Sequence, residues 1–370
     1  MSELQDKKKL AVLMSFSGAG GVEKMMVNLM VEFVTRPDLE LELILIRSSG
    51  PYLKLLPQGI RIHKLKASHS FTAVPELASY FRESKPDALL VAKDRAGRAA
   101  VHARARVGMT FPITLRLGTN LSASLKHRSK LSRWLRLAAI PRIYKKIEHV
   151  VGNSEGVAED IRKLANLPDR QVSIIRNPVV TESMLQKARE DCPHPWLGEP
   201  VPRILAMGRM TVQKDFTTLI KAFAKLRSEM SARLVILGEG AERNLLERLI
   251  KDLGVDTDVM MPGHQTNPYS WLSRADLFVL SSRWEGSPNA LTEAFALGIP
   301  CLSTDCPSGP AEILGGGKYG KLVEVGNVEQ MAQAMKASLV VGGVLENRDS
   351  VLNEYRADVS AANYLSTIFS

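Results

Sequence analysis

The segment SSRWEGSPNALTEAFALGIP, residues Ser281–Pro300, decides how this sequence is interpreted. It follows ADLFVL (Ala275–Leu280), an unbroken apolar run typical of a buried parallel strand. Ser287 is a good N-cap and Pro288 suits a first helical position, so we expect a helix over Asn289–Leu297 that the following glycine ends. A helix that begins on glycine and proline has free backbone N–H groups and a positive dipole end, which suit a phosphate.

Two carboxylates belong to this strand–loop–helix segment. Glu285 lies on the Gly/Pro loop, and Glu293 lies about one and a half turns into the expected helix. Carboxylates there can accept hydrogen bonds from hydroxyl groups, so the segment indicates a site for a sugar carried on a nucleotide diphosphate. The alternative is that Glu293 is an ordinary exposed helix glutamate.

The composition is that of a soluble globular protein. The 370 residues are enough for two domains, with 45% apolar and 24% charged residues. Three cysteines without metal-type spacing (Cys192, Cys301 and Cys306) predict a reduced, cytoplasmic protein. No run approaches the roughly 18 apolar residues of a membrane span, and Leu10–Phe16 is expected to be a first strand rather than part of a signal peptide.

Charge is divided unevenly between the two halves. Residues 1–180 hold 30 Lys and Arg against 16 Asp and Glu, a balance of +14, whereas residues 181–370 hold 19 against 23, a balance of −4. We therefore expect the first half to meet an anionic partner.

Much of this excess lies in residues 121–146, where basic residues alternate with Trp134 and leucines. That is the composition of an interfacial membrane helix, and the alternative is the solvated face of an ordinary core helix. No nucleic-acid-binding motif accompanies the segment, so nucleic acid is not an expected partner. The basic residues are Lys126, Arg128, Lys130, Arg133, Arg136, Arg142, Lys145 and Lys146.

Strand-like and helix-like segments alternate in both halves, which predicts parallel, doubly wound sheets. We expect a first domain over residues 1–180, a proline-rich linker over 181–202 and a second domain over 203–345, with a helix near 350–370 able to pack back on the first. Ligands of such domains bind at the carboxyl ends of the strands. The predicted strands are Leu10–Phe16, Leu41–Ile46, Ala88–Ala92, Val150–Asn153, Val172–Ile175, Arg203–Met207, Arg233–Leu237, Val259–Met261, Leu277–Leu280 and Pro300–Ser303.

Two cations follow the first strand of the second half. That strand ends at Gly208, and Arg209 and Lys214 lie on the loop before the next helix. Cations at a strand end suit a diphosphate, because charge-assisted hydrogen bonds to phosphate are strong and arginine can make two at once. The alternative is a pair of solvated surface side chains.

A glycine-rich loop, Gly18-Ala-Gly20-Gly21, follows the first strand of the chain. Its match to the dinucleotide-binding pattern is weak, because Glu23 occupies the place of the last glycine. Glycines at a strand end still let the backbone approach a ligand closely, and the alternative is a tight strand-to-helix turn. The seven histidines show no metal-ligand spacing, so no metal site is expected.

Three stretches of the second half together resemble the retaining glycosyltransferase family 4, which has the GT-B architecture of two Rossmann-like domains facing across a cleft. They are Gly208–Leu226, Leu234–Leu249 and Met261–Leu314, and the last contains the E-x7-E signature as Glu285 and Glu293. The first half matches more weakly, through Gly18–Met26, Asn153–Ile161 and Arg176–Val179.

The resemblance implies a role for each matching residue. Arg209 and Lys214 would bind the donor diphosphate and neutralise the leaving group, Glu285 would contact the sugar hydroxyls, and Glu293 would hold the ribose. Arg209, Lys214 and Glu285 are thus the expected catalytic residues, without a metal. The other expected donor-binding residues are Gly18, Gly20, Gly21, Gly208, Gly263, Gly286, Ser287, Pro288, Asn289, Leu291 and Thr292.

One feature of the family is missing. Many members carry a histidine near the reacting sugar, at a place that Ile113–Asn120 occupies here without one. Arg116, Thr119 and Asn120 are the expected acceptor-side residues instead.

The resemblance implies a retaining glycosyltransferase that uses a nucleotide-diphosphate sugar, with uracil the expected base and guanine left open. The segment Cys306–Pro310 (CPSGP) resembles members that build bacterial surface polysaccharides, so the expected acceptor is lipid-linked or a saccharide. The expected location is the cytoplasm, with peripheral contact to the inner face of the cell membrane. An NDP-sugar epimerase of the same double-Rossmann shape and a non-catalytic nucleotide-sugar-binding protein are the alternatives.

Overall fold

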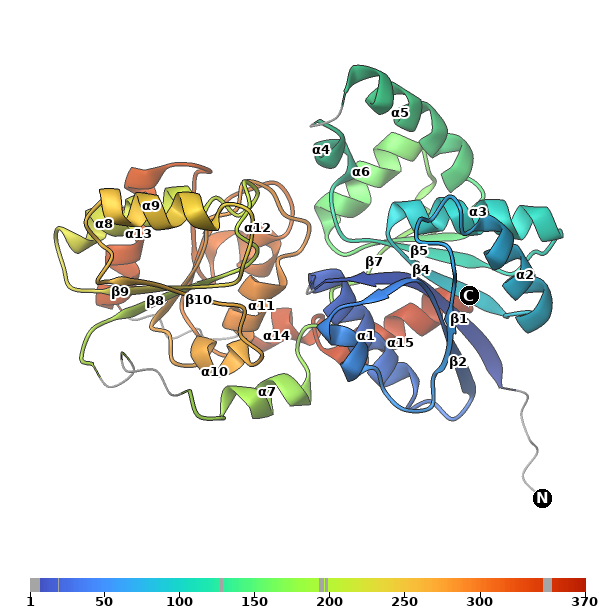
Figure 1. The fold of residues 1–370 in the computed structure, drawn as a ribbon, viewed down its shortest axis with the longest axis horizontal. Helices are drawn as coiled ribbons and strands as arrows, with labels where there is room; N and C mark the ends of the chain where they lie inside the picture. The colour runs from blue at the N-terminus through green and yellow to red at the C-terminus, as the bar shows by residue number, and fades with distance from the viewer. Residues whose placement is uncertain (1–6, 19, 127–128, 193–195, 197–198, 342–347) are drawn as a thin grey trace. The chain divides into compact units, whose positions relative to one another are not determined.

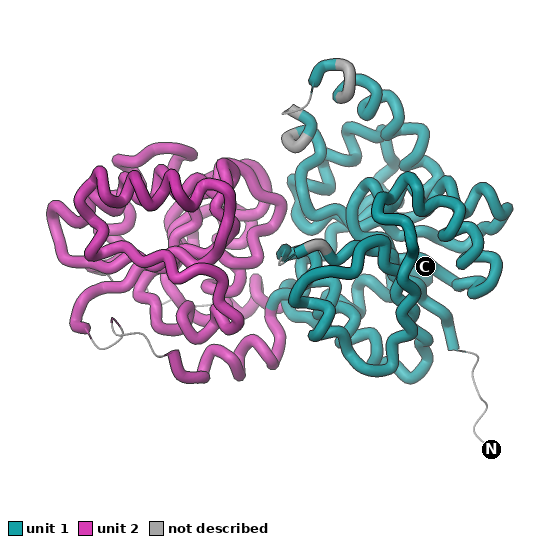
Figure 2. Tube along the Cα trace, viewed as in Figure 1, with its two compact units in different colours: residues 1–179, 354–370 teal, residues 180–353 magenta. Residues whose placement is uncertain are grey.

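The computed structural model describes residues 7–18, 20–126, 129–192, 196, 199–341 and 348–370. The chain divides into two compact units: residues 1–179 with 354–370, and residues 180–353. Figure 2 shows the two units in different colours, and Figure 1 labels their elements. Each unit is a parallel β-sheet covered by helices, so the predicted α/β, doubly wound fold class is confirmed.

Unit 1 contains, within its described residues, a seven-stranded sheet of order β3-β2-β1-β4-β5-β6-β7. The strands are β1 (Lys8–Ser17), β2 (Leu39–Ser49), β3 (Arg61–Lys64), β4 (Ala88–Ala92), β5 (Ile113–Leu117), β6 (His149–Gly152) and β7 (Val172–Ile174). The helices are α1 (Gly21–Phe33), α2 (Val74–Ser84), α3 (Asp94–Val107), α4 (Leu121–Lys126), α5 (Lys130–Tyr144), α6 (Glu155–Ala165) and α15 (Ala357–Ile368).

The sheet of unit 1 is buried on both faces because successive residues of a strand point to opposite sides. Leu10 and Val12 of β1 join a core with α1 and α15, whereas Ala11 and Leu13 join a second core with α2, α3 and α6. The C-terminal helix α15 therefore belongs to unit 1, where Tyr364 packs fully buried.

Unit 2 contains, within its described residues, a six-stranded sheet of order β10-β9-β8-β11-β12-β13. The strands are β8 (Arg203–Met207), β9 (Arg233–Leu237), β10 (Val259–Gly263), β11 (Leu277–Leu280), β12 (Cys301–Thr304) and β13 (Lys321–Val323). The helices are α7 (Glu182–Ala188), α8 (Phe216–Arg227), α9 (Arg243–Asp252), α10 (Pro268–Leu272), α11 (Asn289–Ala296), α12 (Pro310–Ile313), α13 (Val328–Val341) and α14 (Asp349–Asn353).

Residues 181–202 are not simply a linker, as the prolines suggested. Thr181 caps α7 by accepting a hydrogen bond from the Met184 backbone N–H at 3.1 Å, and α7 packs against α10 within unit 2. Further on, the Arg233 guanidinium lies 4.9 Å from the centroid of the Trp196 ring and 2.9 Å from the Glu199 carboxylate. The described residues of this segment therefore belong to unit 2.

Both sheets reverse their strand order once. In unit 1 the reversal lies between β1 and β4, and in unit 2 it lies between β8 and β11. The two loops that leave adjacent strands at such a point run in opposite directions, which opens a crevice at the carboxyl edge of the sheet. Among the described helices, none is both long and apolar enough to cross a bilayer.

Candidate functional site

The candidate site of unit 2 lies at the carboxyl ends of β8 and β11, where the strand order reverses. The loop after β8 carries Arg209 and Lys214, and the loop after β11 carries Glu285. The order of the strands thus brings together two segments that are 71 positions apart in the sequence. Three predicted residues meet at one edge of the sheet for this reason.

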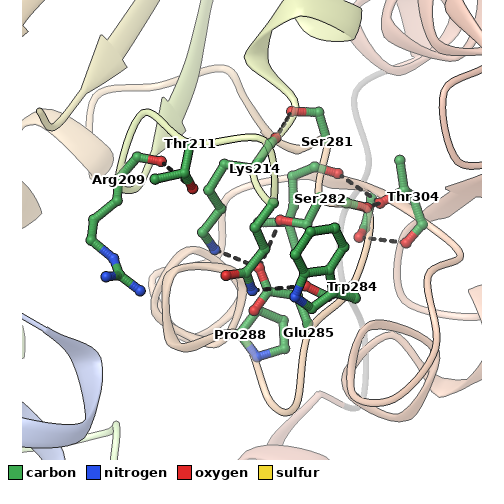
Figure 3. A network of polar contacts seen from close by, with 12 residues as sticks. Arg209, Thr211, Lys214, Ser281, Ser282, Trp284, Glu285, Pro288 and Thr304 are labelled. Carbon is green, nitrogen blue, oxygen red and sulfur yellow. Dashed lines mark hydrogen bonds and ion pairs between the residues drawn. The ribbon is translucent and has the colours of Figure 1, made fainter. Parts of the chain in front are cut away.

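Lys214 and Glu285 form an ion pair at the centre of this site (Figure 3). The Lys214 Nζ lies 2.5 Å from Glu285 Oε1, and the Ser282 hydroxyl donates to the same oxygen at 2.6 Å. The side chains are only 16% and 9% exposed, so the pair is largely shielded from water and its electrostatic interaction is stronger than at a surface. Charge-assisted hydrogen bonds of this kind fix both side chains in position.

Two glycines make room for the lysine. A Cβ atom on Gly208 would lie 3.0 Å from Lys214 Cε, so the aliphatic stem crosses the bare backbone at the end of β8. Gly238 has a φ of +134°, and a Cβ there would lie 2.0 Å from the Gly208 carbonyl oxygen. A larger residue at Gly208 would therefore displace the Lys214 side chain, and one at Gly238 would displace the Gly208 backbone beneath it.

Hydrogen bonds hold the two loops together. The Ser281 hydroxyl donates to the Lys214 carbonyl oxygen at 2.7 Å, and the Gln213 side-chain amide donates to the Trp284 carbonyl oxygen at 2.8 Å. The Arg283 backbone N–H also donates to the Gln213 carbonyl oxygen at 2.8 Å. The site is therefore rigid before any ligand binds, as electrostatic stabilisation of a reaction requires.

Asp215 ties these loops to the helix that follows. It is the N-cap of α8 with a left-handed backbone (φ +49°), and it is 3% exposed. Its Oδ2 accepts from the Thr218 hydroxyl at 2.9 Å and from Arg283 Nε at 3.0 Å. One buried carboxylate thus joins the loop after β8, the first turn of α8 and the loop after β11.

Arg209 differs from Lys214 in being exposed. Within the part of the chain that the structure describes, its guanidinium makes no hydrogen bond or ion pair. Figure 3 shows it extending from the start of the loop, apart from the Lys214–Glu285 pair. Its donors are thus available at the rim of a site that holds one neutralised cation.

The helix α11 begins at Asn289, where the predicted helix begins, but its N-cap differs from the predicted one. Pro288 is the N-cap and Asn289 the first helical residue, and no side chain caps the helix, so Ser287 is not the N-cap. Proline fits because an N-cap takes the extended backbone that Pro288 has, with a φ of −75° and a ψ of 102°. Gly286 lies against the next loop, since a Cβ on Gly309 would be 2.5 Å from the Gly286 carbonyl oxygen.

The remaining predicted residues of α11 face the interior of unit 2. Leu291 and Thr292 are fully buried, and Glu293 is 3% exposed, so Glu293 is not the exposed helix glutamate of the alternative interpretation. Gly263, at the end of β10, has a φ of +82° and lies beside Glu239, whose Oε1 would be 2.8 Å from an added Cβ.

The sequence interpretation missed the polar residues beneath the ion pair. The Thr304 hydroxyl, at the end of β12, donates to the Ser282 carbonyl oxygen at 2.6 Å. Burial, together with the charge of Glu285, raises the pKa of the Cys306 thiol to about 12, so this cysteine stays protonated. These residues could have been found from the sequence, because hydroxyl side chains stand at the ends of two apolar strands. They are Ser281, Ser282 and Thr304.

The predicted glycines of the first half belong to unit 1. Gly18 and Gly20 lie between β1 and α1, and Gly21 is the first residue of α1. A Cβ on Gly20 would lie 2.3 Å from Glu23 Oε2, so the loop backbone passes close to a carboxylate of α1.

Of the three acceptor-side predictions, Arg116 lies in the interior. It is 1% exposed and donates to Asn177 Oδ1 at 2.8 Å, and burial lowers the pKa of its guanidinium while Tyr364 opposes this. Arg116 therefore fastens the carboxyl end of β5 to neighbouring segments of unit 1 and presents no surface to an acceptor. Thr119 is exposed, and Asn120 accepts from the Ser122 hydroxyl at 2.8 Å.

Two family models match the chain. The model described as "Glycosyl transferases group 1" matches residues 201–340, and the model described as "Glycosyl transferase 4-like domain" matches residues 20–178. Together they cover most of both units, and the boundary between them falls near the boundary between the units.

Characterised relatives agree with the models. The chain is 29% identical over 345 residues, 90% of each chain, to a Campylobacter jejuni protein named N-acetylgalactosamine-N,N'-diacetylbacillosaminyl-diphospho-undecaprenol 4-alpha-N-acetylgalactosaminyltransferase. It is 24% identical over 326 residues to the lipopolysaccharide 1,6-galactosyltransferase of Salmonella typhimurium, covering 85% of this chain and 84% of the relative.

Solved structures show the same fold. The structure of Anabaena Alr3699/HepE in complex with UDP superimposes with a TM-score of 0.78 at 18% identity, covering 98% of this chain and 99% of that one. The lipopolysaccharide outer core galactosyltransferase WaaB gives a TM-score of 0.72 at 22% identity, with 98% and 99% covered. The predicted GT-B architecture is confirmed by this likeness.

The role of Asp215 can be tested by stability. Asp215→Ala removes the carboxylate that accepts from Thr218 and Arg283 and places alanine in a left-handed backbone, so we expect it to lower the free energy of unfolding by about 2–4 kcal/mol. Asp215→Asn should lose less, since asparagine tolerates that backbone. Urea unfolding measures both, with the exposed Asp256→Ala as the matched control. Equal stability of Asp215→Ala and Asp256→Ala would contradict the role assigned to Asp215.

Proposed function

The chain belongs to the group 1 glycosyltransferases, and from this premise we propose that it transfers a sugar from a nucleotide-diphosphate sugar to a lipid-linked or saccharide acceptor, with retention of the anomeric configuration. The observation that carries the proposal is the largely buried Lys214–Glu285 pair at the carboxyl edge of unit 2, with the exposed Arg209 on the same loop. The pair offers one hydrogen-bond donor and one acceptor of opposite charge at a single point.

A diphosphate and a sugar would use the two members of the pair differently. The Lys214 ammonium would turn from Glu285 to the donor phosphates, where Arg209 adds a second cation, because the diphosphate carries more negative charge than the single carboxylate. Glu285 keeps its hydrogen bond from Ser282 and becomes free to accept from a sugar hydroxyl. Glu285 thus exchanges its cationic partner for a second hydroxyl donor, so that its largely buried carboxylate stays hydrogen-bonded.

The proposed reaction is supported electrostatically and needs no metal. The bond between the anomeric carbon and the phosphate oxygen breaks, the acceptor oxygen forms its bond on the same face, and the acceptor proton passes to the departing phosphate. Negative charge develops on the diphosphate, and the fixed charges of Lys214 and Arg209 stabilise it. Glu285 positions the sugar in this scheme and forms no covalent intermediate.

The names of the relatives support the substrate classes. One structural neighbour is in complex with UDP and another structure of the same protein with UDP-glucose, which supports a uracil nucleotide as donor. The Campylobacter jejuni relative is named for a diphospho-undecaprenol substrate and the Salmonella typhimurium relative for lipopolysaccharide. We therefore propose a role in the synthesis of a bacterial surface polysaccharide.

We also propose that α5 of unit 1 contacts the inner face of an anionic membrane. Ile140 and Tyr144 of this helix are buried in the unit, whereas Trp134 and Leu135 are 65% and 54% exposed. Of the predicted basic residues, Arg128 lies outside the described part, and Arg136 lies 4.0 Å from Asp94. The exposed ones are Lys130, Arg133, Arg142, Lys145 and Lys146.

Removal of either cation tests the diphosphate assignment. Lys214→Ala and Arg209→Ala should each slow transfer by roughly a hundredfold or more, because each removes a charge that faces the leaving group. Lys221→Ala, an exposed lysine of the adjacent α8, is the matched control and should keep normal transfer. The assay follows glycoside formation with a lipid-linked acceptor, and NMR of the product reads its anomeric configuration.

Several outcomes of this assay would count against the proposal. Near-normal transfer by both variants would contradict the assignment of Lys214 and Arg209 to the diphosphate. Loss of transfer in EDTA would contradict a reaction without a metal. A product with inverted anomeric configuration would contradict the retaining mechanism. Release of an altered sugar nucleotide from donor alone would indicate an epimerase.

The donor base can be identified by thermal stability. A bound donor at a hundredfold excess over its dissociation constant stabilises the folded protein by about 2.7 kcal/mol. We expect UDP-sugars to raise the melting temperature more than GDP- or ADP-sugars at equal concentration, and Lys214→Ala to abolish the rise. A larger rise with a GDP-sugar would replace uracil by guanine in the proposal.

Membrane contact can be tested with vesicles. The chain should co-sediment with phosphatidylglycerol vesicles at low salt and not with phosphatidylcholine vesicles, and added salt should release it because surface charges are screened. The double variant Trp134→Ser, Leu135→Ser should bind more weakly. Phe71→Ser, which changes an 86% exposed aromatic residue outside α5, is the matched control. Sedimentation unaffected by the double variant would exclude α5 as the contact.

A further inference from the structure

Unit 1 has its own strand reversal, between β1 and β4, and two charged residues meet there. The loop after β1 leads into α1, which carries Glu23, and β4 is followed directly by Lys93. The Lys93 Nζ lies 3.2 Å from Glu23 Oε1. The pair thus occupies the place in unit 1 that the Lys214–Glu285 pair occupies in unit 2.

The two members of this pair differ in exposure. The Glu23 side chain is 5% exposed and the Lys93 side chain 44%. A buried carboxylate requires a partner, and Lys93 supplies it while much of the lysine side chain stays accessible. The pair therefore presents the lysine at the surface, with the carboxylate behind it.

The backbone holds Lys93 in a strained conformation. Its φ of +82° lies in the region that residues with a Cβ rarely adopt and that costs of the order of 1 kcal/mol or more. Its N–H donates to the Arg116 carbonyl oxygen at 3.2 Å, and its carbonyl oxygen accepts from the Gly97 N–H at 3.2 Å. Strain that is maintained by the surrounding hydrogen bonds is typical of functional positions.

The loop backbone beside Glu23 carries glycines, which have no side chain. A Cβ on Gly20 would lie 2.3 Å from Glu23 Oε2, and Gly18 of the same loop has open space around it. Neither of these two glycines therefore puts a side chain beside the carboxylate.

We propose that Glu23 and Lys93 bind hydroxyl groups of the acceptor sugar, with Glu23 accepting from one hydroxyl and Lys93 donating to a neighbour. The two charges of the pair cancel, which favours a neutral polyol over a phosphate. In unit 2, by contrast, Arg209 adds an exposed cation to the corresponding pair and makes the site suitable for a diphosphate. The inference rests on the proposed transferase function, since it assigns the acceptor side of that reaction.

The test measures sugar binding apart from turnover. Saturation-transfer NMR is recorded on the full chain with saturating UDP and the methyl glycosides of glucose, galactose, N-acetylglucosamine and N-acetylgalactosamine. At least one glycoside should give a signal with the unaltered protein. Lys93→Met and Glu23→Gln should each weaken its binding roughly tenfold, because each removes a charged hydrogen-bond partner, and Lys93→Arg should retain part of it.

The chain offers a matched control at the opposite end of the same strand. Lys85 also has a positive φ (+49°), but it precedes β4 and therefore lies at the amino edge of the sheet. Lys85→Met should leave glycoside binding unchanged. The shift of melting temperature with UDP should stay normal in every variant, and its absence in the unaltered protein would instead count against the donor site in unit 2.

Three outcomes would overturn the inference. The first is glycoside binding that Lys93→Met and Glu23→Gln leave intact, and the second is a UDP-bound protein that binds none of the four glycosides. The third is a Lys93→Met variant that loses binding of inorganic pyrophosphate but keeps that of the glycosides, which would make the pair an anion site. If Glu23→Gln fails to fold, the result for Lys93→Met alone tests the inference, because that variant alters a partly exposed side chain.

Discussion

The ion pair between Lys214 and Glu285 is the contact on which the candidate site depends. It exists because a doubly wound sheet reverses its strand order once, and the reversal places the ends of β8 and β11 side by side. The cation comes from one loop and the acid from the other, so the pair also fixes the distance between the loops. The strand reversal therefore determines both the arrangement of the two loops and the position of the ion pair.

Shielding such a pair from water is costly, and the surrounding hydrogen bonds offset that cost. Ser282 donates to Glu285, and Thr304 in turn holds the backbone of Ser282. The buried Asp215 carboxylate and the half-exposed Arg283 form a second connection between the same two loops. A ligand that exchanges partners with Lys214 meets loops that do not have to reorganise, which is the requirement for stabilising charge that develops during a reaction.

Much of this arrangement could be predicted from the sequence, because parallel strands and their following helices have strong local patterns. The strands β8, β9 and β11 and the spacing of Glu285 and Glu293 were found in that way. What could not be predicted depends on contacts between distant segments. Arg116 follows the pattern of a strand-end residue, yet Asn177 and Met25, from elsewhere in unit 1, enclose it. The N-cap at Pro288 was misplaced because Ser287 has the better local propensity, whereas the loops around Gly286 and Gly309 set the backbone there.

Each of the two strand reversals places a pair of opposite charges at the carboxyl edge of its sheet. In unit 2 the lysine follows the first strand of the reversal and the acid the second, whereas in unit 1 this order is inverted. Exchanging the two positions is compatible with the same geometry, because an ion pair needs one charge from each loop. Either loop can supply the positive charge. The difference in ligand that we propose comes from the residues around each pair. Arg209 adds positive charge in unit 2, while the glycines beside Glu23 leave a neutral pair open to approach.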